Sequence, residues 1–346
     1  MIKTVDKKRV TIADIALKAG VTKSTVSMVL RNKGGISEPT RKRVMEITKD
    51  MKYSMFPARQ TRGKTHWGQI CFLIISKDNP PPDMKLPLHY FVQMIGGCSS
   101  YAEEKGYSVV FSHLDWNQVE AGTLSAVLER GHADGFLCRA WISPAVNEML
   151  EKLDVPVVLM DCDRYLDRYA SVHVNNIKAM DLVVEHLVKQ GVRRFATITG
   201  NMDHQNAQER LAGFQMALAR RGIQLPPEGL IIESDFTVAN GRQGVQKLLQ
   251  SGYKFDGLVC HFDLQAYGAI EVLTAAGIRV PDDVRVTGFD NEEFSDKISI
   301  PLTTIETNSF QMGRLGAQLL LAQATGENMH TLHVHSEVSL VVRASG

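Results

Sequence analysis

The sequence is poor in the features that mark metal sites, disulfide frameworks and enzymes. Its five cysteines, Cys71, Cys98, Cys138, Cys162 and Cys260, include no C-x-x-C pair. No G-x-G-x-x-G follows the first apolar strand, and neither a P-loop nor an H-E-x-x-H motif occurs. We therefore predict buried free thiols in a reducing compartment, no metal, no cofactor and no enzymatic activity.

Long hydrophobic runs are also absent. No apolar run approaches the roughly 20 residues that cross a bilayer. The N-terminal residues M-I-K-T-V-D-K-K-R lack the apolar stretch of a signal peptide. These absences argue against a membrane protein and predict a cytoplasmic one.

Acidic residues are scarce in the first part of the chain. Residues 1–64 contain 16 Lys and Arg against 5 Asp and Glu, whereas the remaining residues contain 23 against 33. The formal net charge of +1 therefore hides a basic head on an acidic body. This division favours a DNA-binding module on a separate domain over a basic head docked against its own body.

Residues 11–30 are typical of two short amphipathic helices joined by a sharp turn. Thr11 and Thr22 can each cap a helix, and Gly20 gives the turn its backbone freedom. The apolar positions that face inward at helical spacing are Ile12, Ile15, Ala16, Val26, Val29 and Leu30. The outward residues of the second helix are Lys23, Ser24, Ser27 and Met28. This pattern predicts a helix-turn-helix, although an ordinary helical hairpin would share it.

A third helix and a linker follow. Ser37 can cap this helix, and Pro39 fits its first turn. Its apolar stripe consists of Val44, Ile47 and Met51. We predict a three-helix domain over residues 1–53 and a basic hinge, broken by proline and glycine, over residues 54–66.

From residue 67 onward, short apolar strands alternate with helices. We expect strands at about 70–75, 107–111, 135–138, 155–160, 195–199, 230–234, 257–260 and 284–288. We expect helices at about 91–105, 118–130, 146–153, 179–189, 208–221, 241–250 and 264–276. The two series predict two α/β subdomains, each a doubly wound parallel sheet covered on both faces, with a cleft between them.

Ligands of doubly wound folds bind at the carboxyl ends of the strands. The strand-end residues that could line such a site are Asp161, Asp235, Phe236, Phe262, Asp263 and Asp290.

One series of sequence blocks runs through the whole chain. It starts with V-T-I-A-D-I-A-L-K-A-G-V-T-K-S-T-V-S and the helix of residues 37–53. It continues with V-N-N (174–176), E-H-L (185–187), R-L-A-G-F (210–214), V-P-D-D-V-R-V-T-G-F-D (280–290), P-L-T-T-I (301–305) and L-V-V-R (340–343). These blocks, in this order, resemble the LacI/GalR family of bacterial transcription regulators.

The resemblance implies a helix-turn-helix head, a hinge and a periplasmic-binding-protein-like core over residues 67–346. The core would have a first subdomain of residues 67–164 and 306–326 and a second of residues 165–292 and 330–346. The implied partners are a palindromic double-stranded DNA operator and a small-molecule effector, often a sugar or nucleobase. Because one head reads too little DNA for specificity, we expect a homodimer. A tetramer is disfavoured because no heptad tail is present.

The resemblance places the second helix in the major groove, with Lys23, Ser24 and Met28 towards the base edges. Lysine can donate to guanine, serine can bond either way, and methionine makes only apolar contacts. The family usually has Arg at Met28, so we expect an altered base preference, unless Met28 is a core residue. The residues expected to hold phosphates are Thr11, Thr22, Thr25, Arg31 and Asn32.

The hinge departs from the family pattern, in which a Leu from each subunit wedges into the minor groove. Here residues 58–62 read A-R-Q-T-R and contain no Leu. In one interpretation Met55 or Phe56 replaces the wedge and Arg59 or Arg62 enters the minor groove. In the other, Met55 and Phe56 pack the linker on the head.

The effector site is expected around Arg210 and Asp290, which bracket the effector in the family, with Asp161 as a third polar candidate. A guanidinium offers fixed donors and a carboxylate accepts hydroxyl hydrogens, although Arg210 and Asp290 could instead form a structural ion pair. Phe262 stands where the family commonly has a polar residue, which would make the site more apolar or smaller. The aromatic candidates for stacking walls, or for plain core positions, are Tyr90, Phe91 and Phe236.

These expectations combine into one functional prediction. The chain is predicted to be a dimeric transcription repressor whose operator affinity is controlled by an effector, a sugar or sugar derivative, bound between the subdomains. The alternative is a solute-binding or sensor protein of sugar uptake with the same core fold, against which the basic head argues. His330, His333 and His335 alternate as on one strand face, and we do not expect them to bind metal.

Overall fold

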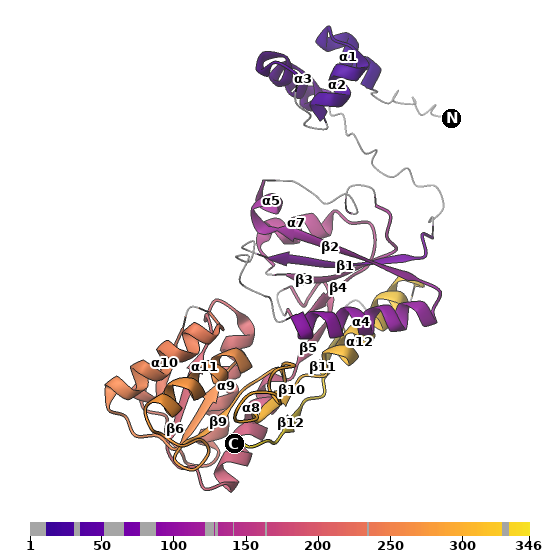
Figure 1. Ribbon diagram of the computed structural model, residues 1–346. Helices are drawn as coiled ribbons and strands as arrows, with labels where there is room; N and C mark the ends of the chain where they lie inside the picture. Colours follow the sequence, from indigo (N-terminus) through magenta and orange to yellow (C-terminus); the bar gives the residue numbers. More distant parts are fainter. Residues whose placement is uncertain are drawn as a thin grey trace. The chain divides into compact units, whose positions relative to one another are not determined.

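The computed structural model describes residues 12–30, 35–51, 66–76, 88–121, 128, 131–140, 142–162, 165–233, 235–326 and 332–346. The chain divides into two compact units, one formed mainly by residues 1–66 and the other by residues 67–128 and 132–346. Figure 1 shows the helices and strands of both units.

Among its described residues, the first unit contains three helices, α1 (Ile12–Ala19), α2 (Lys23–Leu30) and α3 (Glu38–Asp50). Gly20, with φ +64°, makes the turn between α1 and α2. The Thr22 hydroxyl accepts the backbone N–H of Thr25 at 3.1 Å and so caps α2 as predicted. The buried side chains of its core are Ile15, Ala16, Ala19, Val26, Val29 and Val44. The predicted helix-turn-helix is confirmed.

The second unit is built from twelve strands and eight helices among the described residues. The strands are β1 (Gln69–Ser76), β2 (Ser108–Asp115), β3 (Phe136–Ala140), β4 (Val157–Met160), β5 (Ala170–Val174), β6 (Phe195–Thr199), β7 (Leu230–Ile232), β8 (Gly257–Cys260), β9 (Arg285–Thr287), β10 (Thr304–Glu306), β11 (His333–Ser336) and β12 (Ser339–Val341). The helices are α4 (Leu88–Glu104), α5 (Trp116–Glu120), α7 (Pro144–Glu151), α8 (Asn176–Lys189), α9 (Gln205–Ala219), α10 (Val238–Ser251), α11 (Asp263–Ala275) and α12 (Ser309–Ala324).

The strands form two parallel sheets. The first sheet has the order β11-β5-β4-β3-β1-β2, and the second has the order β7-β6-β8-β9. A separate antiparallel pair joins β10 to β12. We call the first sheet with its helices the first subdomain, and the second sheet with its helices the second subdomain.

Helices cover both faces of each sheet, as predicted (Figure 1). Phe72 of β1 packs in a cluster with residues of α4 and α12, whereas the next residue, Leu73, packs in a cluster with residues of α5 and α7. In the second sheet, Phe195 of β6 contacts the cluster that contains α8 and α9, and Ile198 contacts that of α10 and α11. This alternation arises because successive side chains of a strand point to opposite faces.

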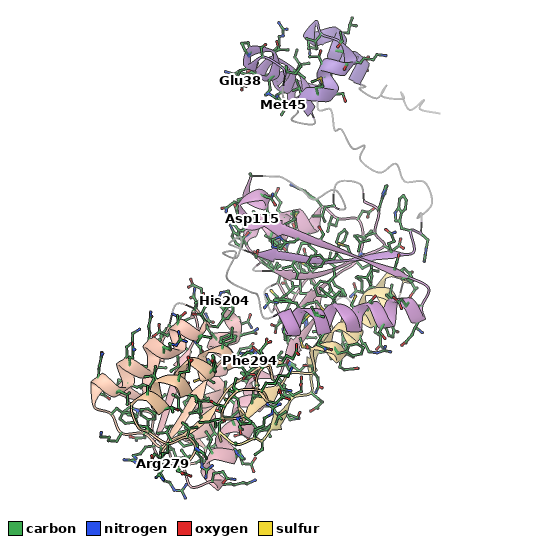
Figure 2. The ribbon with its side chains drawn as sticks, in the orientation of Figure 1. Glu38, Met45, Asp115, His204, Arg279 and Phe294 are labelled. Atoms are coloured by element: carbon green, nitrogen blue, oxygen red, sulfur yellow. The ribbon has the colours of Figure 1, made fainter. Side chains whose placement is uncertain are left out.

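The ends of the elements carry local capping bonds. Asp115, labelled in Figure 2, ends β2 and starts α5. Its carboxylate accepts the N–H of Asn117 at 2.7 Å, and the Gln118 side chain accepts the N–H of Asp115 at 3.1 Å. Both bonds together form a capping box.

The sheet pairing corrects two expectations. Residues 165–174 and 330–346 were assigned to the second subdomain, but β5 and β11 pair with each other and join the first sheet. The sequence of β5, A-S-V-H-V, hides a buried strand because serine and histidine interrupt its apolar run. Of the helix expected over 118–130, the structure describes α5 (Trp116–Glu120) and a helical residue at Leu128, and residues 122–127 and 129–130 lie outside the described ones.

The five cysteines are all buried and form no disulfide bond, as predicted. Within the described residues, no three His, Cys, Asp or Glu side chains come together as a metal site. In the same residues, no helix has the length and apolar content that crossing a membrane requires.

Candidate functional site

Helix α2 presents a polar face on the surface of the head. Thr22, Lys23 and Ser24 are exposed, and Thr25 and Ser27 are half-buried. The inward residues Val26 and Val29 are buried in the core of the head. Of the residues predicted to face outward, Lys23 and Ser24 are thus exposed and Ser27 is half-buried.

The sequence left two roles open for Met28, a contact with DNA and a core position, and the structure has features of both. Met28 is half-buried, and a Cβ atom on Gly35 would lie 3.9 Å from its terminal methyl group. The side chain therefore packs partly against the loop that precedes α3 and keeps part of its surface exposed. The other predicted DNA-contacting residues, Thr11, Arg31, Asn32, Met55, Phe56 and Arg59, lie outside the described residues.

Arg210 on α9 is the centre of a buried polar network in the core. Its Nε donates to Asn176 Oδ1 at 3.0 Å, and one terminal nitrogen donates to the carbonyl of His261 at 2.5 Å. The other terminal nitrogen lies 3.4 Å from Asp290 Oδ1, and the Arg210 side chain is only 3% exposed. The guanidinium also lies 3.5 Å from the ring centroid of Phe289. Arg210 and Asp290, which the sequence predicted together, thus form an ion pair. The bonds to Asn176 and His261 fix the orientation of the guanidinium.

Asp161 and Asp290 occupy corresponding places in the two subdomains. Asp161 directly follows β4, and Asp290 lies three residues after β9. Their backbone φ angles are +54° and +97°, and residues other than glycine rarely adopt such positive values. Such strained residues cluster at functional sites because surrounding structure must hold them in place.

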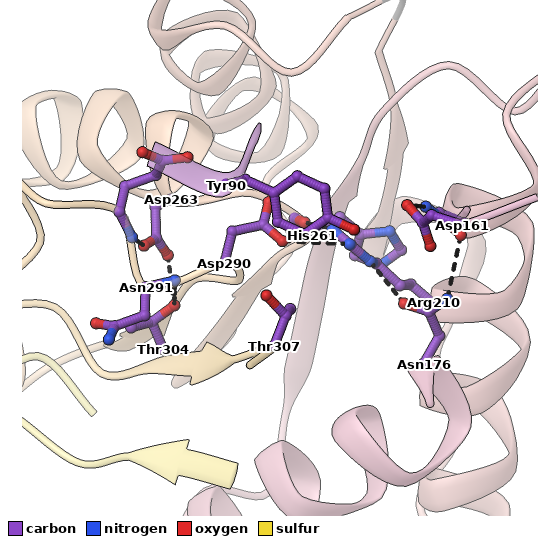
Figure 3. A network of polar contacts seen from close by, with 12 residues as sticks. Tyr90, Asp161, Asn176, Arg210, His261, Asp263, Asp290, Asn291, Thr304 and Thr307 are labelled. Atoms are coloured by element: carbon purple, nitrogen blue, oxygen red, sulfur yellow. Dashed lines mark hydrogen bonds and ion pairs between the residues drawn. The ribbon is translucent and has the colours of Figure 1, made fainter. Parts of the chain in front are cut away.

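The first subdomain contributes Tyr90, Phe91 and Asp161, and also Arg139, to the same network. Arg139 of β3 lies 3.6 Å from Asp161 Oδ2, and its guanidinium lies 5.0 Å from the ring centroid of Phe91. Tyr90 is buried and meets Phe91 edge-to-face at 5.6 Å. Burial, with the charges of Asp161 and Asp290, holds the pKa of Tyr90 well above its usual value. Figure 3 shows Tyr90 with both carboxylates and Arg210 in view.

Phe236 and Phe262 form an aromatic pair beside Arg210. Their ring centroids are 4.9 Å apart, and the Arg210 guanidinium lies 4.8 Å from the Phe262 ring. The structure therefore brings Phe262 to the predicted site, where it adds an apolar and cation–π surface instead of a hydrogen bond.

Several buried polar atoms of this network have no hydrogen-bond partner among the described residues. They are Asp161 Oδ1, Arg139 Nε, both ring nitrogens of His261 and Thr307 Oγ1. Native proteins rarely leave buried polar atoms unpaired. The donors and acceptors gathered here are suited to a ligand that carries several hydroxyl groups.

Asp263, also a strand-end candidate, has a different place in the network. Its carboxylate accepts the hydroxyls of Ser295 and Thr304, each at 2.6 Å, and the N–H of Glu292 at 2.8 Å. Both carboxylate oxygens of Asp263 are thus bonded to the loop that follows Asp290 or to β10, as Figure 3 shows in part. Asp263 therefore supports the segment that carries Asp290.

Comparison with known proteins identifies two domains. The profile of "Bacterial regulatory proteins, lacI family" matches residues 11–55, which contain the helix-turn-helix. The profile of "Periplasmic binding protein-like domain" matches residues 184–346 of the core. The chain therefore combines a lacI-family helix-turn-helix domain with a periplasmic-binding-protein-like domain.

Three relatives match almost the whole chain. The HTH-type transcriptional repressor CytR of Escherichia coli K12 is 28% identical over 97% of this chain and 96% of its own. The transcriptional regulator CelR in complex with cellobiose is 28% identical, with a TM-score of 0.71 over 98% of this chain and 100% of its own. The Lac repressor dimer bound to operator and the anti-inducer ONPF is 28% identical, with a TM-score of 0.70 over 98% of this chain and 99% of its own.

Sequence reasoning missed four polar or aromatic residues of the network in the core. They are Arg139, Asn176, Asn206 and His261. Arg139 carried a signal, because an arginine inside the apolar strand F-L-C-R-A requires a partner. Asn176 and Asn206 had none beyond their place near strand ends, since only tertiary contacts show which asparagines converge.

Glu292 provides a pH-dependent test of this site. Burial, with the nearby charges of Asp290 and Asp263, raises the pKa of Glu292 from 4.5 to about 7. A carboxyl whose pKa is higher in the folded than in the unfolded state stabilises the fold fully below the unfolded-state pKa. For Glu292 this contribution is lost as the pH rises from 4.5 through about 7. We expect Glu292→Gln, which cannot ionise, to match the parent protein at pH 4, below the unfolded-state pKa. At pH 8 its free energy of unfolding should be about 1 kcal/mol higher than that of the parent protein, because the parent then holds an ionised carboxylate there. The difference stays this small because water partly screens the carboxylate. Urea unfolding at both pH values would contradict this if the difference stayed constant.

Proposed function

We propose that this chain represses transcription by binding a palindromic operator through α2, and that a small-molecule effector bound between the subdomains controls its operator affinity. One observation carries the proposal: a helix-turn-helix with exposed Lys23 and Ser24 is joined to a core in which charged strand-end residues of two sheets converge. The relatives support it, since CytR is named a repressor and the Lac repressor is seen on operator.

In this proposal the head separates sequence reading from positioning. Lys23 and Ser24 reach base edges in the major groove, where donors and acceptors identify base pairs. Thr22 and Thr25, at the start of α2, hold phosphates, together with Thr11, Arg31 and Asn32. Met28, half-buried against the loop at Gly35, offers only an apolar surface to the DNA. It favours a thymine methyl over the guanine that an arginine would select.

The effector would be held by Arg210 and Asp290 from one subdomain and by Asp161, with Arg139, from the other. Tyr90, Phe91, Phe236 and Phe262 would supply the walls. Two guanidinium–carboxylate pairs and two aromatic pairs suit a hydroxyl-rich ring, so we propose a sugar or sugar derivative. The complex of CelR with cellobiose is consistent with this class of ligand.

The proposed assembly is a homodimer. A palindromic operator requires two heads related by two-fold symmetry. The edge strands β2 and β7 each expose one large apolar side chain, Phe111 at 52% and Ile232 at 53%. Exposed edge strands with apolar side chains tend to pack against another chain, so we propose these two edges as candidates for the dimer interface.

The experiment that tests the proposed function has two stages. A thermal-shift screen of sugars, nucleobases and small acids would identify effectors from the rise in melting temperature. Operators selected from genomic fragments would then be titrated with the full chain in the presence and absence of each effector. Absence of any sequence preference would contradict the repressor function, and an unchanged operator affinity with a bound effector would contradict effector control.

Lys23→Ala tests how the head reads DNA. We expect at least a tenfold loss of affinity for the operator but little loss for random DNA, because Lys23 contributes about 1–3 kcal/mol of base discrimination. Lys42→Ala on the exposed surface of α3 is the matched control and should weaken both DNAs by similar small factors. Fluorescence anisotropy on both DNAs measures this. Equal losses on operator and random DNA for Lys23→Ala would show that Lys23 contacts phosphate only.

A further inference from the structure

Asn206 forms a hydrogen bond between the two subdomains. It lies on α9 of the second subdomain, and its Nδ2 donates to Asp161 Oδ2, at the end of β4 in the first subdomain, at 2.6 Å. The Asp161 side chain is only 4% exposed, so this bond is shielded from water. A shielded bond to a carboxylate is stronger than one at the surface.

The bond completes a continuous polar chain through the core. Asn176 Nδ2 donates to Asn206 Oδ1 at 3.3 Å, and Asn176 Oδ1 accepts from Arg210 at 3.0 Å. The chain therefore runs from Arg139 and Asp161, through the two asparagines, to Arg210 and Asp290. Each end of this chain is one of the two guanidinium–carboxylate pairs described above, so Asn206 and Asn176 join the two halves of the site.

We propose that Asn206 is a specificity-determining residue of the effector site that mimics a ligand hydroxyl. It donates to Asp161 the hydrogen bond that an effector would donate, and thereby holds the subdomains together when no effector is bound. This inference rests on the effector site proposed above.

The proposal defines the chemistry of the effector group at Asp161. A group that takes the place of the Asn206 amide at Asp161 Oδ2 must itself be a donor. A hydroxyl meets both partners, because it donates to the carboxylate and accepts from the freed amide. The second carboxylate oxygen, Asp161 Oδ1, has no partner among the described residues and can accept from a neighbouring hydroxyl. Two adjacent hydroxyls are therefore the recognised pattern.

Exchanging the donor Asn206 and the acceptor Asp161 of this bond tests the proposal without a ligand. Spin labels on cysteines introduced at the exposed Glu148 and Asp203 would report the distance between the subdomains of the full-length protein. Asn206→Asp sets two carboxylates against each other, so the distance distribution should widen and shift to longer values. Adding Asp161→Asn restores a donor–acceptor pair with reversed direction and should return the distribution to that of the parent. Gln205→Ala, a neighbouring amide whose bond ends at Glu209 on the same helix, is the matched control and should change nothing.

The outcomes separate the two proposals. Non-additive recovery in the double variant supports the bond, because coupled residues give such cycles and independent residues do not. An unchanged distance distribution in Asn206→Asp would overturn the inference. So would a distribution in the double variant that stays as wide as in the single one. Failure of the proposed function appears instead as a parent protein that binds operator and random DNA equally, whatever the spin labels report.

Discussion

We expect Arg210→Ala to destabilise the core by about 3–5 kcal/mol and to abolish the response to effector. Removal of the guanidinium leaves Asp290, whose side chain is 11% exposed, without its cation. A buried charge that loses its partner costs this much because neither water nor another group replaces it. The variant also removes the donor to the carbonyl of His261 and to Asn176 Oδ1. Urea unfolding measures the first effect, and the effector-dependent rise in melting temperature measures the second.

Arg210→Lys separates the charge from the directed hydrogen bonds. A lysine keeps the cation near Asp290 but cannot reproduce the forked geometry that reaches Asn176, His261 and Asp290 together. We therefore expect a smaller loss of stability than in Arg210→Ala, together with a loss of effector response. A stable Arg210→Ala core that still responds to effector would show that Arg210 lies outside the effector site.

Gly313→Ala should be equally damaging, for a reason of packing alone. Helices α4 and α12 cross so closely that a Cβ on Gly313 would lie 1.9 Å from the carbonyl oxygen of Met94, and one on Gly97 would lie 1.8 Å from that of Phe310. The atoms that clash belong to the backbone, which cannot move without separating the helices. We expect the free energy of unfolding to fall by about 3 kcal/mol or more, as measured by denaturant titration.

Gly96→Ala is the matched control, one residue from the contact on α4. A Cβ there would meet only the Phe310 ring, at 3.8 Å, which is an ordinary van der Waals contact. Because alanine favours helix over glycine by roughly 1 kcal/mol, this variant should be neutral or slightly more stable. Similar unfolding free energies for Gly96→Ala and Gly313→Ala would refute the close crossing.

The sequence predicted the parts of the fold that follow from local patterns. The turn at Gly20, the cap at Thr22 and the alternation of apolar strands with helices all arise from neighbouring residues, and the structure confirms them. Strand β5 was not predicted because Ser171 and His173 break its apolar run. It forms nonetheless because it pairs with β4 and β11, which lie far away along the chain at residues 157–160 and 333–336.

The same distinction applies to the candidate site. Arg210, Asp290 and Asp161 were predicted from their positions at strand ends and within family-like blocks, and the structure brings them into one network. Arg139 and Asn206 were not, because their importance depends on which side chains face them across the subdomains. A carboxylate is a plausible ligand-binding group from its position alone, whereas an asparagine on a helix becomes one only through its partner.

Effector-controlled repression is tested most directly by the affinity of the full-length protein for a selected operator. This affinity would be measured at several salt concentrations, with and without the effector found by thermal shift. Specific binding should be 10³-fold or more tighter than binding to random DNA and should weaken steeply as salt rises. Saturating effector should change it by at least about fivefold. Equal affinity for operator and random DNA, or an operator affinity that a bound effector leaves unchanged, would contradict an effector-controlled repressor.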